Sequence, residues 1–205
     1  MAISKEQIIE VAARLFQERG YHATSVQDIA DQLGVTKAAL YYYVKNKEHT
    51  LYEIFDRAMS AVEHRIMDII DTNLKAEEKL TRLIAMHIRA LLDEITIITV
   101  FFNERIHLPP EHQAIVNMRR RQYEEKIAQI IREGTATGIF KEVDALPTAY
   151  AILGMCNWLY QWYNPYGRLK PDELAQLYSS IILKGMLAPQ KTSKLKTESR
   201  SLWPE

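Results

Sequence analysis

Apolar residues recur at helical spacing along almost the whole chain. In the first segment Ile8, Val11, Ala12, Leu15 and Phe16 occupy positions i, i+3, i+4, i+7 and i+8, which lie on one face of a helix. Similar patterns, separated by glycine and proline, predict about nine helices. Their expected ranges are 4–19, 24–33, 37–43, 47–71, 76–93, 95–107, 110–134, 145–164 and 171–187. The pattern therefore predicts an all-α fold.

Start and stop signals mark the first three helices. Ser4 can cap the first helix, with Gln7 three residues later as in a capping box. Gly20 can end this helix, and Gly34 ends the second, because glycine accepts the positive φ of a helix C-terminus. Thr36 can cap the third, which is short.

Composition fits a compact soluble protein. The chain has 205 residues, of which 47% are hydrophobic, so it can form a sizeable core as one domain or as a small head on a larger body. Its formal net charge is zero, so any nucleic-acid contact must come from a local cluster of charge. The single cysteine, Cys156, excludes an intrachain disulfide and suits a reducing compartment.

We expect a cytoplasmic protein with no membrane partner. The N-terminus has no basic segment followed by an apolar one, so it does not resemble a signal peptide. The most apolar window, 95–102, is much shorter than the roughly 20 residues that span a bilayer. The residues from 191 to 205 are polar and are expected to form a C-terminal tail.

The segment 25–43 has the pattern of a helix, a glycine turn and a second helix. Residues 35–47 contain three lysines and no acidic residue, and three consecutive tyrosines follow Leu40. Because side chains on a helix point about 100° apart, at least one tyrosine must face outward. This argues against the alternative, a helical hairpin with an aromatic core stripe. Tyrosine hydroxyls and helix N-terminal amides bind phosphates, and residues near the helix N-terminus reach base edges. We therefore interpret 1–50 as a DNA-binding head.

The head resembles that of the TetR family of transcriptional regulators. The resemblance covers about residues 5–52, and its most specific part is the sequence Leu40-Tyr41-Tyr42-Tyr43-Val44-Lys45-Asn46-Lys47 followed by Leu51. It implies that Tyr41 and Lys47 hold phosphates and that Ser25 adds a phosphate contact. Thr36, Lys37, Ala38 and Tyr42 would face the major groove of double-stranded operator DNA. It also implies a homodimeric repressor with a helix-turn-helix head and a ligand-binding, dimerising helical body at 51–190.

The aromatic residues of the body allow two interpretations. Trp158 and Trp162 are i, i+4 neighbours in the expected helix 145–164. They can belong to the core or a dimer interface, or they can line a ligand pocket. The last two helices are expected to form the interface as a four-helix bundle. Their apolar or small residues are Ala149, Ile152, Leu153, Cys156, Leu174, Leu177, Tyr178, Ile181, Ile182 and Gly185.

Two body segments, 102–112 and 154–169, resemble the branch of TetR regulators that sense acyl-coenzyme A thioesters and control fatty-acid or sterol breakdown. This implies a long-chain or polycyclic acyl-CoA as effector, not as cofactor. The expected ligand-binding residues are Phe101, Phe102, Asn103, Arg105, Met155, Trp158, Trp162 and Arg168. Arg119, Arg120 and Arg121 can meet CoA phosphates. Alternatively they form a solvated helix face paired with Glu124 and Glu125.

Other function classes find little support in the sequence. There is no glycine-rich phosphate loop, His-Glu-x-x-His or Cys-x-x-Cys motif, so we expect no enzyme activity, no metal site and no cofactor. Cys156 lies in an apolar segment and is expected to be a core thiol. Two alternatives stay open: a repressor that responds to a different hydrophobic molecule, and a DNA-binding regulator with no ligand.

Overall fold

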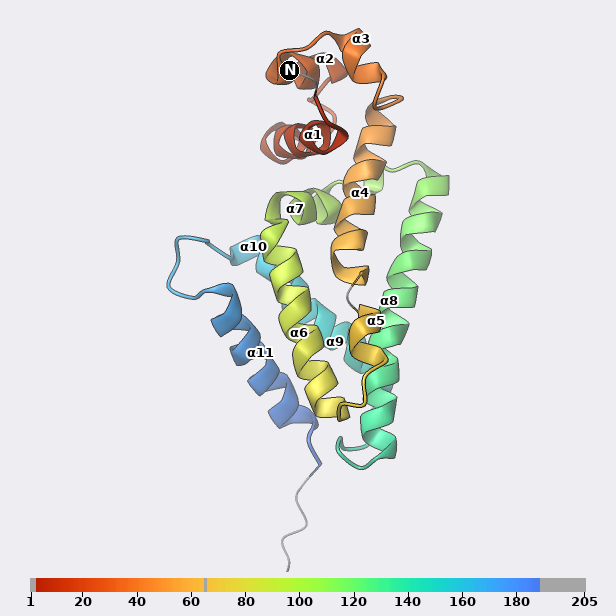
Figure 1. Cartoon of the computed structure of the whole chain (residues 1–205), viewed down its shortest axis with the longest axis vertical. Helices are drawn as coiled ribbons and strands as arrows, with labels where there is room; N and C mark the ends of the chain where they lie inside the picture. Colours follow the sequence, from red (N-terminus) through yellow and green to blue (C-terminus); the bar gives the residue numbers. More distant parts are fainter. Residues whose placement is uncertain (1–2, 65, 189–205) are drawn as a thin grey trace, which may run out of the picture.

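The computed structural model describes residues 3–64 and 66–188, and every regular element of that part is helical. The predicted all-α fold is confirmed. Three helices form a head above a bundle made by the others, and α4 runs from one into the other (Figure 1). The predicted tail 191–205 lies outside the described residues.

The elements are α1 (Lys5–Arg19), α2 (Val26–Leu33), α3 (Lys37–Tyr41), α4 (Lys47–Glu63), α5 (Ile66–Ile70), α6 (Ala76–Asp93), α7 (Ile95–Asn103), η1 (Arg105–His107), α8 (Pro110–Ala136), α9 (Ala145–Asn157), α10 (Leu159–Trp162) and α11 (Pro171–Met186).

Three predicted helices are interrupted. The range 47–71 divides into α4 and α5, the range 145–164 divides into α9 and α10, and the range 95–107 continues after Asn103 only as the short 3-10 helix η1. No glycine or proline marks the break at Trp158, so periodicity alone predicts a continuous helix there. The break lets Leu159 become fully buried while α10 packs on α6 and α7. Tertiary packing thus overrides the local pattern.

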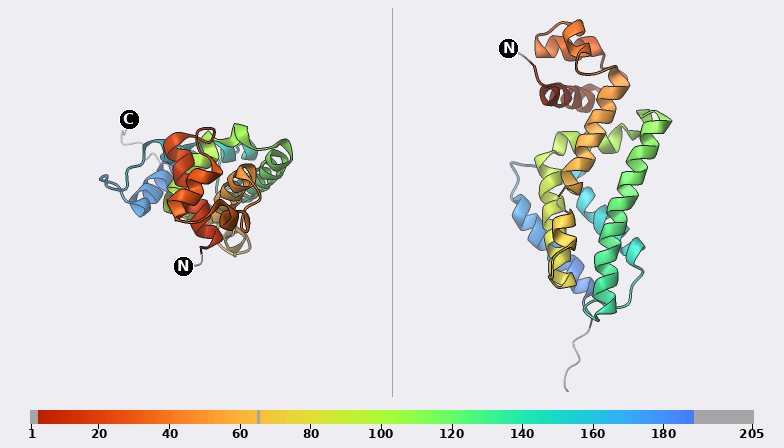
Figure 2. Two further views of the ribbon diagram at one scale, coloured as in Figure 1. Left: turned by 90° about the horizontal axis from the view of Figure 1, so that it is seen from above. Right: turned by 45° about the vertical axis from the view of Figure 1, so that its right-hand side comes forward.

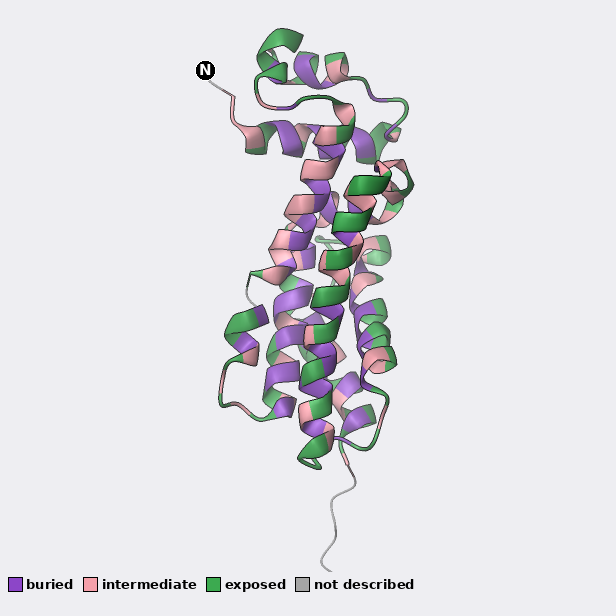
Figure 3. Ribbon diagram, turned by 90° about the vertical axis from the view of Figure 1, so that its right-hand side faces the viewer, coloured by how far each residue is buried: buried purple, intermediate pink, exposed green. Residues whose placement is uncertain are grey.

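Helix α4 connects the head to the body. It packs against α1 in the head and against α6, α7 and α8 in the body, and the views in Figures 1 and 2 show it crossing the boundary. Its buried side includes Leu51, Ile54 and Phe55, all without solvent exposure. Complete burial of each such side chain contributes about 1.5–3 kcal/mol. The body helices likewise turn their buried residues toward one another (Figure 3).

Polar contacts fix the head on the body. Arg57 of α4 donates from Nη2 to Glu94 Oε1 at 2.8 Å and pairs with Glu10 of α1 at 3.3 Å. In the loop that follows α1, the backbone N–H of Tyr21 donates to Glu104 Oε1 at 3.3 Å. The Tyr21 ring stacks on that of His107, with centroids 5.2 Å apart. Arg57, Glu94 and Glu104 therefore fix α1 and the loop after it relative to α4 and α7.

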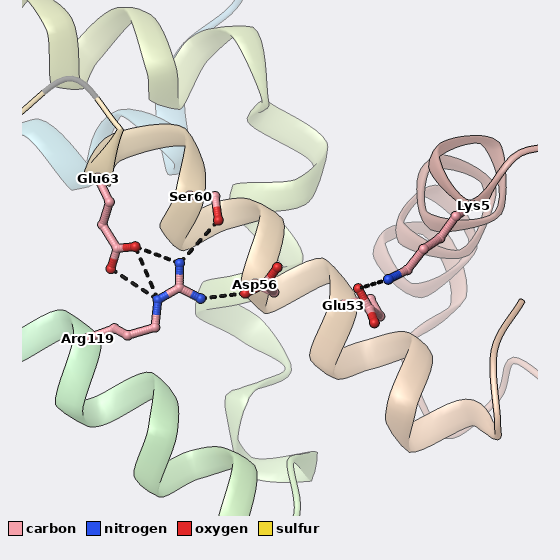
Figure 4. Close-up of polar contacts among 6 residues, drawn as sticks. All are labelled: Lys5, Glu53, Asp56, Ser60, Glu63 and Arg119. Atoms are coloured by element: carbon pink, nitrogen blue, oxygen red, sulfur yellow. Dashed lines mark hydrogen bonds and ion pairs between the residues drawn. The ribbon is translucent and has the colours of Figure 1, made fainter.

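Arg119 joins α8 to α4 through several bonds to one guanidinium (Figure 4). It donates to Asp56 Oδ1 at 2.5 Å, to Glu63 Oε2 at 2.6 Å and to Ser60 Oγ at 3.1 Å. Burial disfavours its charged form, but Glu63 and Asp56 outweigh this and raise the pKa of Arg119. The expected solvated face of three arginines is therefore wrong for Arg119, whereas Arg121 is exposed and Arg120 pairs with Glu124 as predicted.

A buried polar network links α6, α8 and α9. His87 Nδ1 lies 2.9 Å from Tyr123 Oη, and His87 Nε2 lies 2.8 Å from Asn157 Oδ1. Complete burial lowers the pKa of His87, against the smaller opposing effect of its hydrogen bond to Asn157. Burial also raises the pKa of the nearby Cys156 thiol to about 12, which fits the predicted core thiol. His87 is therefore neutral in the folded protein.

Searches for two other kinds of site gave negative findings. Among residues 3–64 and 66–188, no helix has the length and apolar composition needed to cross a membrane. In the same described residues, no cluster of three or more His, Cys, Asp or Glu side chains is arranged to hold a metal ion.

Replacing Arg119 with alanine should lower the free energy of unfolding by about 1–3 kcal/mol, because Asp56 and Glu63 then lose their counter-charge. Arg121→Ala is the matched control, since Arg121 is exposed on the same helix and its loss should cost no more than about 0.5 kcal/mol. Urea unfolding of both variants at one protein concentration measures the difference. Equal losses would contradict the assigned role of Arg119.

The pH dependence of stability should report on His87. Below about pH 6.5 the unfolded chain binds a proton at His87 that the folded chain excludes, so stability falls as the pH is lowered. This residue alone contributes up to about 1.4 kcal/mol per pH unit. The stability advantage of the wild type over His87→Gln should therefore shrink between about pH 7.5 and about pH 5. An advantage that stays constant in urea unfolding across this range is the contrary result.

Candidate nucleic-acid interface and ligand cavity

The exposed part of α3 lies at the end of the head away from the body (Figure 1). The predicted DNA contacts Thr36, Lys37, Ala38, Tyr41 and Tyr42 are all exposed there, and 86% of Tyr42 is accessible to solvent. The Lys37 ammonium lies 5.8 Å from the centre of the Tyr41 ring. These residues, hereafter the α3 surface, combine a positive charge, two phenol hydroxyls and one small side chain that permits close approach.

Local bonds hold α3 in this position. Gly34 adopts the left-handed conformation with φ of 68°, and the N–H of Val35 donates to Ala30 O at 3.0 Å. Thr36 Oγ1 accepts from the N–H of Ala39 at 3.2 Å, which leaves the hydroxyl proton free for another acceptor. Leu40 is completely buried between its neighbours. A helix of five residues, which is unstable alone, is thus fixed by its surroundings.

Ser25, a predicted phosphate contact, also caps the N-terminus of α2. Its hydroxyl donates to Asp28 Oδ2 at 2.5 Å and accepts from the N–H of Asp28, so the two residues form a capping box for α2. The bonds from Ser25 lower the pKa of the Asp28 carboxyl. A phosphate contact at Ser25 stays a prediction, and it would have to form beside this carboxylate.

Lys47, the other predicted phosphate contact, is engaged within the head. Its ammonium donates to Thr24 O at 2.7 Å and to His22 O at 3.5 Å, and it lies 4.2 Å from the centre of the Tyr21 ring. Partial burial lowers its pKa. An ammonium has three N–H donors, so one can still reach a phosphate. Lys47 therefore holds the loop between α1 and α2 whether or not it contacts DNA.

A cavity of about 270 Å³ lies in the body between α4, α6, α7, α8 and α9. Most of its wall is apolar. The lining residues are Ala58, Met59, Val62, His87, Leu91, Ile98, Phe101, Phe102, Arg120, Tyr123, Glu124, Tyr150, Leu153, Gly154 and Asn157. A concave apolar space with a few polar groups is typical of a small-molecule site.

One charged pair borders this cavity. Arg120 Nε lies 3.2 Å from Glu124 Oε1, although its N–H is not aligned for a hydrogen bond. The Arg120 side chain is 42% exposed, whereas that of Glu124 is 10% exposed, so the pair reaches from the cavity toward solvent. Burial lowers the pKa of Arg105, and the charge of Arg120 lowers it further. The Arg105 guanidinium itself donates to Asn117 Oδ1, and the charge of Glu124 partly offsets that of Arg120 at this site.

The structure brings only some of the predicted ligand residues to the cavity. Phe101 and Phe102 line it, as does Arg120, one of the three arginines that can meet CoA phosphates, whereas Arg105 is absent from its wall. The others are exposed and absent from its wall: Asn103, Met155, Trp158, Trp162 and Arg168. Trp158 and Trp162 are 60% and 47% exposed because the chain breaks between α9 and α10. The ligand contacts predicted for Trp158 and Trp162 stay predictions, because neither residue lines the cavity.

Several lining residues were not among the predicted ligand contacts. Met59 and Val62 come from α4, His87 and Leu91 from α6, and Tyr123 from the middle of α8. In sequence each fits the core side of an amphipathic helix. Only the order in which the helices pack decides which core positions border a space. His87 was the one detectable signal, because a histidine in an apolar stripe requires partners.

An apolar surface is exposed where α9, α10 and α11 lie. It contains Tyr150, Met155, Trp158, Trp162, Leu177 and Ile181, each between 37% and 60% exposed. Of the residues expected at a dimer interface, Leu177 and Ile181 belong to this surface. Six others are already buried within the chain, which corrects that expectation: Ala149, Ile152, Leu153, Cys156, Leu174 and Ile182. Exposed patches of this kind mark association surfaces.

Comparisons with known proteins match both parts of the chain. A family model described as "Bacterial regulatory proteins, tetR family" matches residues 8–54. A second, described as "Tetracyclin repressor-like, C-terminal domain", matches residues 73–186. The first match contains α2, α3 and the start of α4, and the second contains α6 to α11.

Individual proteins resemble the chain over most of its length. The HTH-type transcriptional repressor KstR2 of Mycolicibacterium smegmatis is 28% identical over 191 residues, 92% of this chain and 93% of that protein. The fatty acid metabolism regulator protein of Bacillus subtilis is 32% identical over 136 residues, 66% of this chain and 70% of that protein. The crystal structure of AibR in complex with isovaleryl coenzyme A and operator DNA is similar with a TM-score of 0.77 and 28% identity, covering 86% and 96% of the two chains.

The second family model alone matches more than half of the chain, and the first matches the head. The fold agrees with that of solved members of the family. This chain therefore belongs to the TetR family of bacterial transcriptional regulators, a family of DNA-binding regulators and not of enzymes.

Proposed function

We propose that the chain represses transcription as a homodimer on a palindromic operator, and that an acyl-CoA in the body cavity releases it from DNA. One observation carries the proposal: the cavity has α4 and α7 as walls, and these same helices hold the head. A ligand that changes the cavity therefore acts on the elements that orient the α3 surface.

The DNA part of the proposal follows from the size of the recognition element. One α3 surface is too short to read a long site, and the chain has no net charge to bind DNA by attraction alone. Two copies related by a two-fold axis would read half-sites about 34–36 Å apart or a multiple of that. The apolar surface on α9 to α11 offers the area for association.

The cavity and the relatives support an acyl-CoA effector. The apolar wall suits a hydrocarbon group, and Arg120, with Arg105 beside it, offers charge to the CoA portion near the exposed end. KstR2 is named as a repressor, and the Bacillus protein is named for fatty acid metabolism. AibR binds isovaleryl coenzyme A and operator DNA in one complex. Because the thioester and the DNA are bound together in that complex, the test must also establish whether the ligand weakens or strengthens DNA binding.

The size of the cavity links ligand binding to movement. Its volume of about 270 Å³ is below the roughly 300–1,000 Å³ that is usual for ligand pockets. A long-chain or polycyclic acyl group would require a wider space. Widening must displace a wall, and α4 and α7 are the walls that also contact α1. The ligand would thus favour a body shape in which the two heads no longer match the operator.

Lys37→Ala should change base preference at one symmetric pair of operator positions, by about 1–3 kcal/mol, because Lys37 would reach a base edge. Lys47→Ala should weaken binding to all sequences and also destabilise the head, since its ammonium holds the Thr24 carbonyl. Lys75→Ala, an exposed lysine at the start of α6, is the control and should change neither. Binding to variants of a selected operator at several salt concentrations measures these effects.

Two results would contradict the DNA part. A uniform loss of affinity in Lys37→Ala, with base preference unchanged, would remove Lys37 from the major groove. A footprint over a single non-palindromic half-site would overturn the homodimer.

Titration of the protein–operator complex with acyl-CoA thioesters should lower its affinity for DNA by roughly 5–150-fold, an ordinary coupling of about 1–3 kcal/mol. Operator DNA must weaken thioester binding by the same factor. Free fatty acids and unacylated CoA should act far less, because each lacks one half of the ligand. Arg120→Gln should weaken thioester binding about tenfold, through loss of a charged hydrogen bond. Arg121→Gln, an exposed arginine of the same helix, is the control.

Different outcomes would separate the parts of this proposal. Release by free acids as strong as by thioesters would point to a different hydrophobic effector. Thioester binding that leaves DNA affinity unchanged or raises it would overturn release. No thioester binding at micromolar concentration would overturn the acyl-CoA effector and leave the DNA-binding regulator.

A further inference from the structure

The inner part of the cavity wall contains a polar group that the proposed function does not use. His87, Tyr123 and Asn157 come from three helices, and all three line the cavity. His87 and Tyr123 are only 4% exposed, whereas the charged side chain of Arg120 is 42% exposed. The cavity wall therefore contains a charged pair that reaches toward solvent and a polar group that is mostly buried, among apolar residues.

The hydrogen bonds of this polar group can run in either of two directions, and the first follows from the assigned Asn157 amide. His87 is neutral and carries one ring proton. Since Nε2 donates this proton to Asn157 Oδ1 at 2.8 Å, Nδ1 must accept the Tyr123 hydroxyl proton at 2.9 Å. The two N–H groups of Asn157 Nδ2 then have no acceptor among the described residues, and Tyr123 Oη keeps a lone pair. The network therefore has one unused donor group and one unused acceptor.

Reversing the network leaves the same capacity. If the Asn157 amide is turned, its Nδ2 donates to His87 Nε2, and His87 Nδ1 donates to Tyr123 Oη. The free acceptor is then Asn157 Oδ1, and the free donors are the Tyr123 hydroxyl and the second N–H of Asn157 Nδ2. In both directions the polar group can donate at least one further hydrogen bond and accept another. This capacity matches an oxygen atom, either a ketone or a hydroxyl, and a hydrocarbon cannot use it.

The unused donor and acceptor of this network affect which ligands the cavity selects. A ligand that displaces water from an apolar cavity without satisfying a buried donor forfeits the hydrogen bond that water supplied. Sites that hydrogen-bond a substrate oxygen therefore reject analogues that lack it much more strongly than apolar pockets reject an extra methylene. A filled apolar core at these three positions would join α6, α8 and α9 without this penalty.

We propose that the effector's acyl group carries a ketone or hydroxyl oxygen that binds Tyr123 and Asn157 in the cavity wall. The CoA portion extends toward solvent past the exposed side chain of Arg120. This proposal rests on the proposed acyl-CoA effector and narrows it: the regulator selects an oxygenated acyl group over a plain fatty acyl chain of equal length.

Direct binding to the wild-type dimer tests the selectivity. Octanoyl-CoA is compared with its isomeric keto and hydroxy derivatives, in which the oxygen is moved along the chain one carbon at a time. Calorimetry gives the dissociation constant of each thioester. At least one isomer should bind about tenfold or more tightly than octanoyl-CoA, because a donor in the cavity wall that a hydrocarbon leaves unused is then satisfied. The advantage should be confined to one or two neighbouring positions, because the network is fixed in space.

Isosteric variants assign the advantage to the network. Tyr123→Phe and Asn157→Leu should each reduce the ratio between the best isomer and octanoyl-CoA to near one. Tyr150→Phe is the matched control, since Tyr150 lines the same cavity but its hydroxyl makes no hydrogen bond with a described residue. It should leave the ratio unchanged. Because the ratio is measured within one variant, a general loss of stability does not alter it.

The outcomes separate this proposal from the one on which it rests. If octanoyl-CoA binds as tightly as every oxygenated isomer, the oxygen-binding role is overturned and the acyl-CoA effector survives. If Asn157→Leu weakens the binding of every thioester by the same factor, the ratio between the best isomer and octanoyl-CoA does not change. The network would then bind the thioester carbonyl that all of them share, and the proposal is overturned. If no thioester binds, both proposals fall together.

Discussion

The apolar side of α4 has to be buried by two structures at once. Its residues from Leu51 to Val62 pack against α1 of the head and against α6, α7 and α8 of the body. A helix removed from water along one continuous face cannot turn toward one partner without affecting its contact with the other. The position of the α3 surface and the width of the cavity therefore depend on the same packed helix.

Ion pairs on the other sides of α4 add direction to this packing. Glu53 pairs with Lys5 at 2.7 Å, Arg57 pairs with Glu94 at 2.8 Å, and Arg119 binds Asp56 and Glu63 (Figure 4). Apolar contact is tolerant of rotation, whereas hydrogen bonds to charged groups depend on angle. The paired residues of α4, from Glu53 to Glu63, are spread over about three helical turns, so together they define how α4 is rotated between the head, α7 and α8.

The sequence predicted the parts of the molecule that depend on local chemistry. Capping residues such as Ser4 and Thr36, together with Gly34, set the head helices close to the expected bounds, and the α3 surface is as exposed as the tyrosine argument required. The breaks within 47–71 and 145–164 were missed, because they result from tertiary packing at residues whose local pattern continues a helix. Of the cavity wall, the sequence located only Phe101, Phe102 and the candidate phosphate contact Arg120. The cavity's other walls are core positions in sequence, and only the spacing between helices leaves them bordering a space.

The contacts of the head are divided between distant parts of the chain. Tyr21 and Glu10 belong to the first fifty residues, but their partners Glu104, His107 and Arg57 do not. The sequence boundary between head and body is therefore not a structural boundary. A chimaera that joins this head to the body of another regulator at residue 50 would lose the groups that set the angle of α1. The smallest transferable unit is the head together with α4 and the segment from Glu94 to His107, so exchange of operator specificity between such proteins requires two grafts, not one.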